Sequence, residues 1–159
     1  MPEVSRHRPP VSSAPLAVTP AKEADIPVIL SILEACRGSL PALAEDGADT
    51  LLRRNVRRGS AAVARLDGCA AGVCVWSPVL RRISLLAVLP EARGAGVASA
   101  LLRDALRQLP PGDVCVETFC AGDARGRPAL ALYQKFGFVP DGELTGFKLP
   151  MQKLRLRRD

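Results

Sequence analysis

A glycine-rich turn near the middle of the chain is the clearest indication of chemistry. Residues 93–98 read RGAGVA, and a run of small and branched apolar residues follows them. Glycine allows the backbone to approach a ligand closely, and the first N–H groups of a helix have no partner within that helix. A glycine-rich turn that enters a helix can therefore bind phosphate through its backbone. The alternative is a tight turn that only allows a helix to pack closely on a strand.

Two common phosphate-binding patterns fit this turn poorly. A P-loop requires a lysine directly after its last glycine, and neither Gly94 nor Gly96 is followed by one. A dinucleotide-binding fingerprint begins directly after a strand, whereas residues 89–92 separate this turn from the apolar run before it. The sequence therefore favours neither of these two classes of nucleotide-binding protein.

Apolar periodicity places the turn within a mixed order of strands and helices. Helices are expected where apolar residues recur every three to four positions, and strands where apolar runs are short or alternate. Asp67 and Gly68, between two such runs, are a hairpin signal. The expected strands cover 15–20, 60–66, 70–76, 82–89, 113–119, 138–144 and 147–154, and the expected helices cover 21–36, 45–59, 97–109 and 129–136. This order predicts an α/β fold, a sheet layered with helices, and excludes a helix bundle or a β-sandwich.

Length and composition predict one domain with a tail. The chain has 159 residues, of which 48% are hydrophobic and 24% charged, as in an ordinary globular protein. Residues 1–15 are rich in proline and serine and have no periodic apolar face, so we expect a flexible tail before a single domain at 16–159. The only histidine, His7, falls in that tail and is not expected to be catalytic.

Cysteine usage indicates a reducing compartment. The five cysteines include no C-x-x-C pair, and four of them lie in apolar, strand-like runs. This pattern is typical of buried thiols without disulfides or zinc. No apolar run is long enough to cross a membrane, and the N-terminus lacks the hydrophobic segment of a signal peptide. We therefore expect a cytoplasmic protein with no membrane partner and no metal.

Two stretches of the sequence together look like the GNAT superfamily of N-acyltransferases. The first, LLAVLPEARGAGVASALL, resembles the acyl-CoA motif of that family at residues 93–98. The second, ALALYQKFGFVPDGE, resembles the L-Y-x-x-x-G-F element of the family at residues 132–138. The two motifs occur in the family's order, and the elements from Leu16 onward agree with it as well. The resemblance thus covers nearly the whole chain apart from the tail.

The resemblance implies a GNAT fold and an acyl transfer. The expected sheet is mixed and mostly antiparallel, with about six to seven strands, helices on both faces and a splayed central strand pair. The gap between the splayed strands is expected between residues 83–88 and 113–119. The implied activity is that of an enzyme which transfers an acetyl group from acetyl-CoA to a primary amine by direct attack. The cofactor-binding residues that the resemblance implies are Leu86, Ala87, Val88, Arg93, Gly94, Ala95, Gly96, Val97, Ala98 and Ser99.

Two residues are candidates for the proton chemistry. Tyr133, the only tyrosine, matches the family's proton donor to the CoA sulfur, with packing in the core as its alternative role. Many family members carry an acid on the central strand, but residues 83–88 contain none. Glu117, in the apolar strand beside the expected gap, is the substitute candidate for the general base, with an ion pair or a rim position as the alternative. Gly126 is a second departure, because the family often has asparagine there.

The acceptor is open at this stage. Neutralising a lysine-like amine at pH 7 costs about 4.6 kcal/mol, against about 1 kcal/mol for an α-amino group, so a site without a strand acid favours a weakly basic amine. Arg53, Arg54, Arg57 and Arg58 share one helix face, which is either a solvated surface or a surface that attracts an anionic acceptor.

Three functions stay open beside one another. The first is an acetyltransferase for a small-molecule or peptide amine, with a homodimer left open. The second is a non-catalytic acyl-CoA-binding regulatory module, suggested by the missing strand acid. The third is a basic RNA-directed binder or an aminoacyl-tRNA acetyltransferase, for which the excess of 22 Lys and Arg over 16 Asp and Glu is the sole support.

Overall fold

The computed structural model describes residues 15–40, 47–120, 122–146 and 149–159. The tail predicted for residues 1–15, with His7, lies outside the described residues except for Pro15. The strands are β1 (Leu16–Pro20), β2 (Ala61–Leu66), β3 (Cys69–Ser77), β4 (Arg82–Val88), β5 (Val114–Phe119), β6 (Val139–Gly146) and β7 (Leu149–Leu156). The α-helices are α2 (Ile26–Ala35), α3 (Ala48–Arg58), α4 (Val97–Gln108) and α5 (Arg127–Lys135). The predicted order of elements is confirmed.

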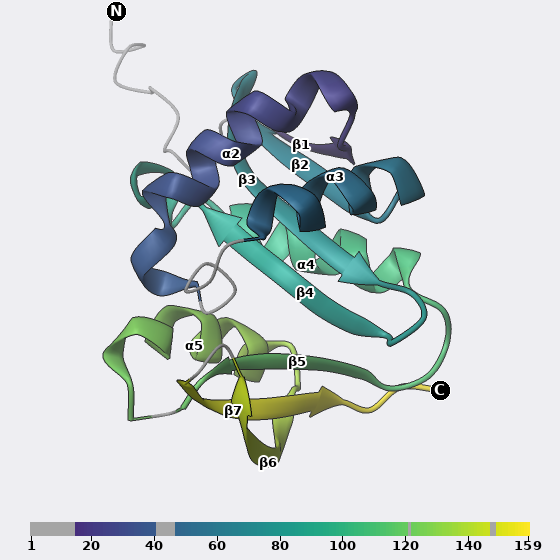
Figure 1. Ribbon diagram of the computed structural model, residues 1–159, viewed down its shortest axis with the longest axis vertical. Coiled ribbons are helices and arrows are strands. Elements are labelled where there is room, and N and C mark those ends of the chain that lie inside the picture. The colour runs from purple at the N-terminus through teal and green to yellow at the C-terminus, as the bar shows by residue number, and fades with distance from the viewer. Residues whose placement is uncertain (1–14, 41–46, 121, 147–148) are drawn as a thin grey trace, which may run out of the picture.

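The seven strands form one sheet in the order β1-β2-β3-β4-β5-β7-β6. All neighbouring pairs are antiparallel except β4 and β5, which are parallel. Helices α2 and α3 cover one face of the sheet, and α4 lies on the other (Figure 1). The predicted mixed, mostly antiparallel sheet with helices on both faces is therefore confirmed.

Each face of the sheet has its own hydrophobic core. On one face, Ile29, Ile32 and Leu52 of α2 and α3 pack with buried residues of β2, β3 and β4. On the other face, Leu101 and Leu102 of α4 pack with residues of the same strands and of β5 and α5. Successive residues of β2 belong alternately to the two cores, Ala61 and Val63 to one and Ala62 and Ala64 to the other, because successive side chains of a strand point in opposite directions.

Strands β4 and β5 separate after a short contact. The described residues of these strands pair at two positions only, Arg82 with Cys115 and Ile83 with Val116. Next to this contact, β4 contains a bulge: Trp76 faces Ile83 and Val75 faces Leu85, which leaves Ser84 without an opposite residue in β3. The expected splay is present, and it begins just beyond Ile83, one residue later than predicted.

Local sequence explains how the elements beside this gap are built. Asp67 and Gly68 both have positive φ, 54° and 83°, as the two-residue turn between β2 and β3 requires. At Gly72 of β3, an added Cβ would lie 2.9 Å from the carbonyl oxygen of Ala87 and 3.0 Å from the side chains of Val97 and Leu101. The lack of a side chain at this position lets the first turns of α4 pack directly on the sheet.

Candidate active site

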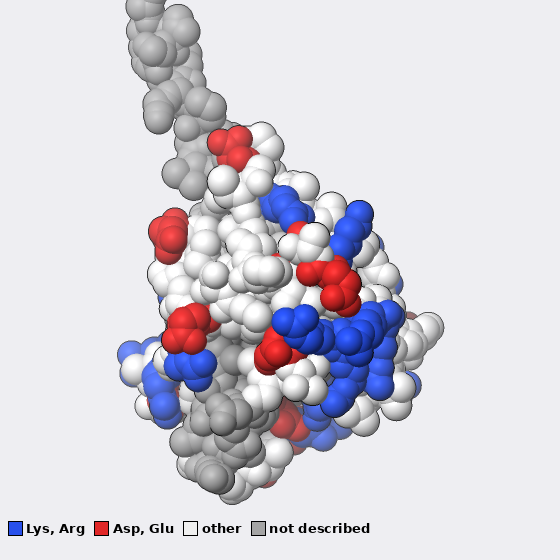
Figure 2. Space-filling model, turned by 45° about the horizontal axis from the view of Figure 1, so that its top comes forward, with Lys and Arg blue, Asp and Glu red and all other residues white. Residues whose placement is uncertain are grey.

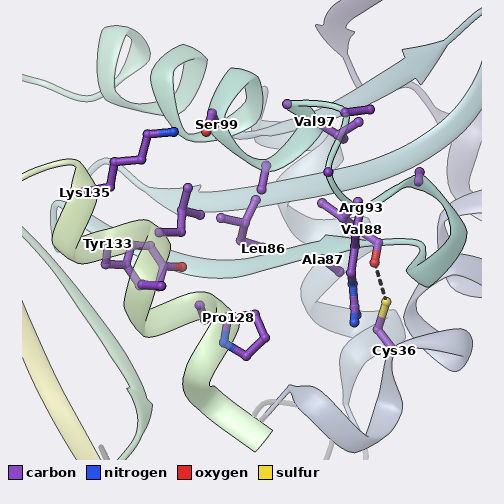
Figure 3. A pocket seen from close by; sticks show the side chains of 18 of the residues that line it. Cys36, Leu86, Ala87, Val88, Arg93, Val97, Ser99, Pro128, Tyr133 and Lys135 are labelled. Atoms are coloured by element: carbon purple, nitrogen blue, oxygen red, sulfur yellow. Dashed lines mark hydrogen bonds between the residues drawn. The ribbon is translucent and has the colours of Figure 1, made fainter. Parts of the chain in front are cut away.

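A cavity of about 770 Å³ opens where β4 and β5 separate. It lies between the end of β4, the first turn of α4 and helix α5 (Figure 3). All ten residues that the sequence singles out for cofactor binding line it, together with Tyr133. The other lining residues are Cys36, Leu40, Ala92, Arg125, Pro128, Ala129, Ala131, Leu132 and Lys135.

The glycine-rich turn leads directly into helix α4. Gly94 and Gly96 have φ values of 86° and 83°, which L side chains rarely adopt, and Gly96 is the residue that caps the helix. The first backbone hydrogen bond of α4 runs from the N–H of Ala100 to the oxygen of Gly96, at 3.0 Å. The N–H groups of residues 97–99 precede that bond and are available to an anion at the cavity wall.

Tyr133 lies in the core, with its hydroxyl pointing into the cavity (Figure 3). Its ring packs edge to face on Phe138, with 5.3 Å between the ring centroids. Burial raises the pKa of the Tyr133 phenol above its ordinary value, and the neighbouring Cys74 thiol adds to this. Both expected roles are therefore compatible: the ring is packed in the core, and the hydroxyl remains protonated and faces the cavity.

Glu117 lies apart from the residues that line the cavity. Val114 and Val116 belong to the core under α4, so Glu117 points to the opposite face of β5. Its Oε2 lies 3.8 Å from Nη1 of Arg82, and its side chain is 25% exposed. The structure gives this residue the ion pair that was its alternative role, on the face of the sheet that α2 and α3 cover elsewhere.

The structure explains the glycine at position 126. Gly126 is buried, and an added Cβ would lie 2.7 Å from the Cβ of Phe119, which is closer than side-chain carbons approach. An asparagine therefore cannot fit here without displacing β5. The adjacent Arg125 lines the cavity, lies 4.3 Å from the centroid of the Phe119 ring and pairs with Asp123 at 2.6 Å.

Cys36 and Lys135 line the cavity but were missed as site residues. Cys36 follows α2, and its Sγ donates a hydrogen bond to the oxygen of Val88 at 3.2 Å. Nothing in the sequence signals this contact, because 52 residues separate the two partners. Lys135 lies two positions after Tyr133 at the end of α5, with Ser99 at the same end of the cavity (Figure 3).

The expected burial of the cysteines is correct for two of them. All five lie in the described residues, and no pair forms a disulfide. Cys36 and Cys74 are buried, Cys115 and Cys120 are partly buried, and Cys69 is exposed. The expectation fails for Cys69 because it begins β3 at the solvent end of the hairpin, directly after Gly68.

The described residues contain neither a cluster of metal ligands nor a membrane-spanning helix. No group of three or more His, Cys, Asp or Glu side chains among them could hold a metal ion. Of the helices in the described ranges, none is long and apolar enough to span a membrane.

Comparisons with known proteins agree with this architecture. Residues 57–140 match the family model described as an acetyltransferase (GNAT) domain. No curated protein matches the sequence significantly. Among solved structures, a GNAT-family acetyltransferase from Bacillus cereus superposes with a TM-score of 0.75 at 18% identity, covering 91% of this chain and 98% of that one.

Two similar structures contain acyl-CoA ligands. Salmonella typhimurium yncA, a protein solved with acetyl-CoA, has a TM-score of 0.69 at 16% identity and covers 91% of this chain and 94% of that one. Arabidopsis thaliana Naa50, in complex with the bisubstrate analogue CoA-Ac-MVNAL, has a TM-score of 0.70 at 14% identity, with coverages of 89% and 97%. These identities show a shared fold. Because the family model spans more than half of the chain, the protein belongs to the GNAT acetyltransferases, which are acyl-CoA-dependent enzymes.

Proposed function

We propose that this enzyme transfers an acetyl group from acetyl-CoA to a weakly basic primary amine, by direct attack without a covalent enzyme intermediate. One observation carries the proposal. The glycine-rich turn, Tyr133 and the end of β4 that lacks a partner on its β5 side all line one cavity, at the point where β4 and β5 separate. We further propose that residues 16–159 act as a single domain and that the segment before them is a flexible tail.

The residues present fit acetyl-CoA. The N–H groups at the start of α4 and the side chain of Arg93 would bind the pyrophosphate. Beyond Ile83, the described part of β4 has no strand partner on its β5 side, so the backbone at 86–88 can pair with the pantetheine amides. Acetyl-CoA in Salmonella yncA and the CoA analogue in Arabidopsis Naa50, two proteins of the same fold, support this ligand.

Tyr133 would protonate the departing sulfur. When acetyl-CoA is bound, it supplies a thioester whose carbonyl carbon the amine attacks. The C–N bond would then form and the C–S bond would break, the thiolate would take the proton of the Tyr133 hydroxyl, and the phenolate would recover a proton from solvent. Burial keeps that hydroxyl protonated throughout the neutral range, because it raises the pKa of the phenol.

Glu117 would accept a proton from the amine. It faces the side of the sheet away from α4, and the guanidinium of Arg82 holds it at the mouth of the splay. Because Glu117 does not line the cavity, it would reach the amine from the acceptor side, through solvent. A base that acts through solvent suits an amine that is already largely neutral at pH 7, such as an α-amino group, better than it suits a lysine side chain.

The test is thiol release from acetyl-CoA over a panel of amines, with wild type beside Tyr133→Phe. We expect turnover on peptides with a free amino terminus to exceed turnover on lysine side chains, and kcat to fall about 100-fold or more in the variant. Acetyl-CoA binding without turnover on any amine would instead support the non-catalytic binding module. Faster turnover on lysine side chains would contradict the assigned acceptor class.

A further inference from the structure

Three arginines of α3, Arg54, Arg57 and Arg58, form an exposed basic surface, which we call the α3 surface. None of the three forms an ion pair with a described residue, whereas Arg53 pairs with Asp49 at 2.9 Å. Lys and Arg side chains gather densely on the side of the molecule where α3 lies (Figure 2). This surface therefore presents positive charge that the described residues do not neutralise.

The stability of α3 does not explain all of these charges. Arg57 and Arg58 lie in the last turn, where cations interact favourably with the helix dipole. Arg54 lies one turn earlier, and its spacing of four residues from Arg58 places two like charges side by side, which opposes helix formation. The helix is held by the buried Leu52 and Val56 instead. Arg54 thus has a cost for the fold and no partner among the described residues.

The α3 surface and Glu117 lie on the same side of the sheet. Leu52 and Val56 pack α3 against the face that carries Val63, Val73 and Leu85. Glu117 points to this face as well, since its neighbour Val116 belongs to the opposite core. A molecule that approaches Glu117 from this side therefore comes from the face covered by α2 and α3, and not from the face covered by α4.

Backbone contacts connect the end of α3 to Glu117 across adjacent strands. The oxygen of Ser60, two residues after α3, accepts a hydrogen bond from the N–H of Trp76 at 3.0 Å. The next residue, Ser77, pairs with Arg82 of β4, and Arg82 in turn holds Glu117. These contacts place the C-terminal end of α3 at the same end of the sheet as the mouth of the splay, across β3 and β4.

We propose that the acceptor is an acidic peptide whose carboxylates bind the α3 surface while its amino terminus reaches the splay. This inference rests on the proposed acetyl transfer and names its substrate class. The α3 surface offers three guanidinium groups, so an acidic peptide with several carboxylates can form more charge-assisted hydrogen bonds with it than a small mono-anion can. RNA is less favoured, because the surface contains no aromatic side chain on which bases could stack.

The experiment compares two peptides of equal length with the same two N-terminal residues, one followed by Asp and Glu and the other by Ser and Gln. Acetylation is measured as kcat/KM at about 50 and 300 mM salt. The variant Arg54→Gln/Arg58→Gln removes two of the arginines that form no ion pair with a described residue. The control, Lys22→Gln/Arg157→Gln, removes the same charge from two exposed positions outside α3.

In wild type we expect kcat/KM to be about 5- to 10-fold higher for the acidic peptide at low salt, through a lower KM, and this preference to shrink at high salt. The α3 variant should lose most of the preference, and the control should keep it. The variant loses both an unfavourable pair of like charges and a favourable cation at the helix end, so its thermal midpoint should change little and a structural loss would be visible separately.

Three results would overturn the proposal. Equal kcat/KM for both peptides in wild type would show that the acceptor is not selected by charge. A preference retained in the α3 variant would place the recognition elsewhere. RNA binding that the α3 variant loses, with no effect on peptide preference, would assign the surface to nucleic acid. Failure of the proposed function would look different, because neither peptide would then be acetylated at all.

Discussion

The Sγ of Cys36 lies 3.2 Å from the backbone oxygen of Val88 and donates a hydrogen bond to it. This contact attaches the end of α2 to the end of β4, directly before the chain enters the turn that leads to α4. Both residues line the cavity. A thiol that the sequence suggested to be incidental therefore forms part of the wall against which an acyl-CoA would lie.

Acetyl-CoA should protect Cys36 from alkylation. Cys36 is 2% exposed and burial raises the pKa of its thiol, which Arg93 offsets only in part, so labelling should be slow even without ligand. A bound acyl-CoA covers the cavity and should slow it further, by about the factor 1 + [L]/Kd. Peptide mass spectrometry after timed N-ethylmaleimide treatment measures this directly.

Cys69 provides an internal control in the same experiment. It is exposed and lies at the hairpin between β2 and β3, so its labelling should be fast and independent of acetyl-CoA. Equal protection of both cysteines would indicate a global effect of the ligand on stability. Labelling of Cys36 at an unchanged rate under saturating acetyl-CoA would contradict the placement of the ligand in this cavity.

Glu117→Gln should change turnover more than substrate binding. Because Glu117 is proposed to accept the proton of the amine, its removal should lower kcat by about 10- to 100-fold. The expected KM for acetyl-CoA is unchanged, since Glu117 lies outside the cavity wall. Arg82→Gln is the matched variant, because it breaks the ion pair and leaves the carboxylate in place. An unchanged kcat in Glu117→Gln would restrict this residue to its ion pair.

Substitution of Gly126 by asparagine should destabilise the protein. The glycine has an ordinary φ of −96°, so the expected cost comes from the contact with Phe119 and not from backbone strain. Overpacking of this kind costs about 1–3 kcal/mol, measurable as a lower midpoint in urea denaturation. Gly122→Asn is a suitable control, because an added Cβ there meets nothing within 4 Å. Equal stability of the two variants would mean that β5 yields easily at Phe119.

The free energy of unfolding should fall as the pH rises above about 9. Burial raises the pKa of Cys74 from its ordinary 9.0 and that of Tyr133 from its ordinary 10.0. The unfolded chain then releases protons that the folded chain keeps, so each group lowers stability by up to about 1.4 kcal/mol per pH unit above its ordinary pKa. Below pH 8 neither group contributes a slope.

Replacing Cys74 isolates its contribution to the loss of stability at high pH. Cys74→Val keeps an apolar side chain of similar size and removes the titrating thiol, so the decline between about pH 9 and 10 should become shallower than in wild type. Equilibrium urea unfolding at half-unit pH steps gives both slopes. Parallel curves for the two proteins would mean that the Cys74 thiol ionises equally well in the folded state.

Local patterns were sufficient to predict the elements, and the family resemblance added the cavity wall on one side. The hairpin at Asp67 and Gly68, the turn at Gly94 and Gly96 and the start of α4 depend on backbone conformations that the residues themselves favour. The lining residues 86–88 and 92–99 also lie close together in the sequence, so the position of β4 largely determines the position of the turn that follows it. The order of elements along the chain followed from the alternation of these segments, whereas the order of strands in the sheet, with β7 between β5 and β6, did not.

The parts that escaped prediction depend on contacts between distant segments. The bond from Cys36 to Val88 and the clash that keeps position 126 a glycine both arise only after the sheet has formed. The direction of Glu117 depends on which side of β5 faces α4, and an apolar strand with one acid does not reveal this. The exposure of Cys69 follows from its position at the end of a hairpin, which composition alone does not convey.

The two residue pairs that join β4 to β5 also bear on how the molecule opens. The other five pairs of neighbouring strands share five or six residue pairs each. The sheet therefore consists of two panels, β1–β4 and β5–β7, that are joined by the short contact between β4 and β5. The core under α4 also joins β5 and β7 to the other strands, so we expect this core, more than the strand contact, to hold the two parts of the sheet together. A ligand that lies along both edges would tie the panels together, so substrate binding would also be a step in the completion of the fold.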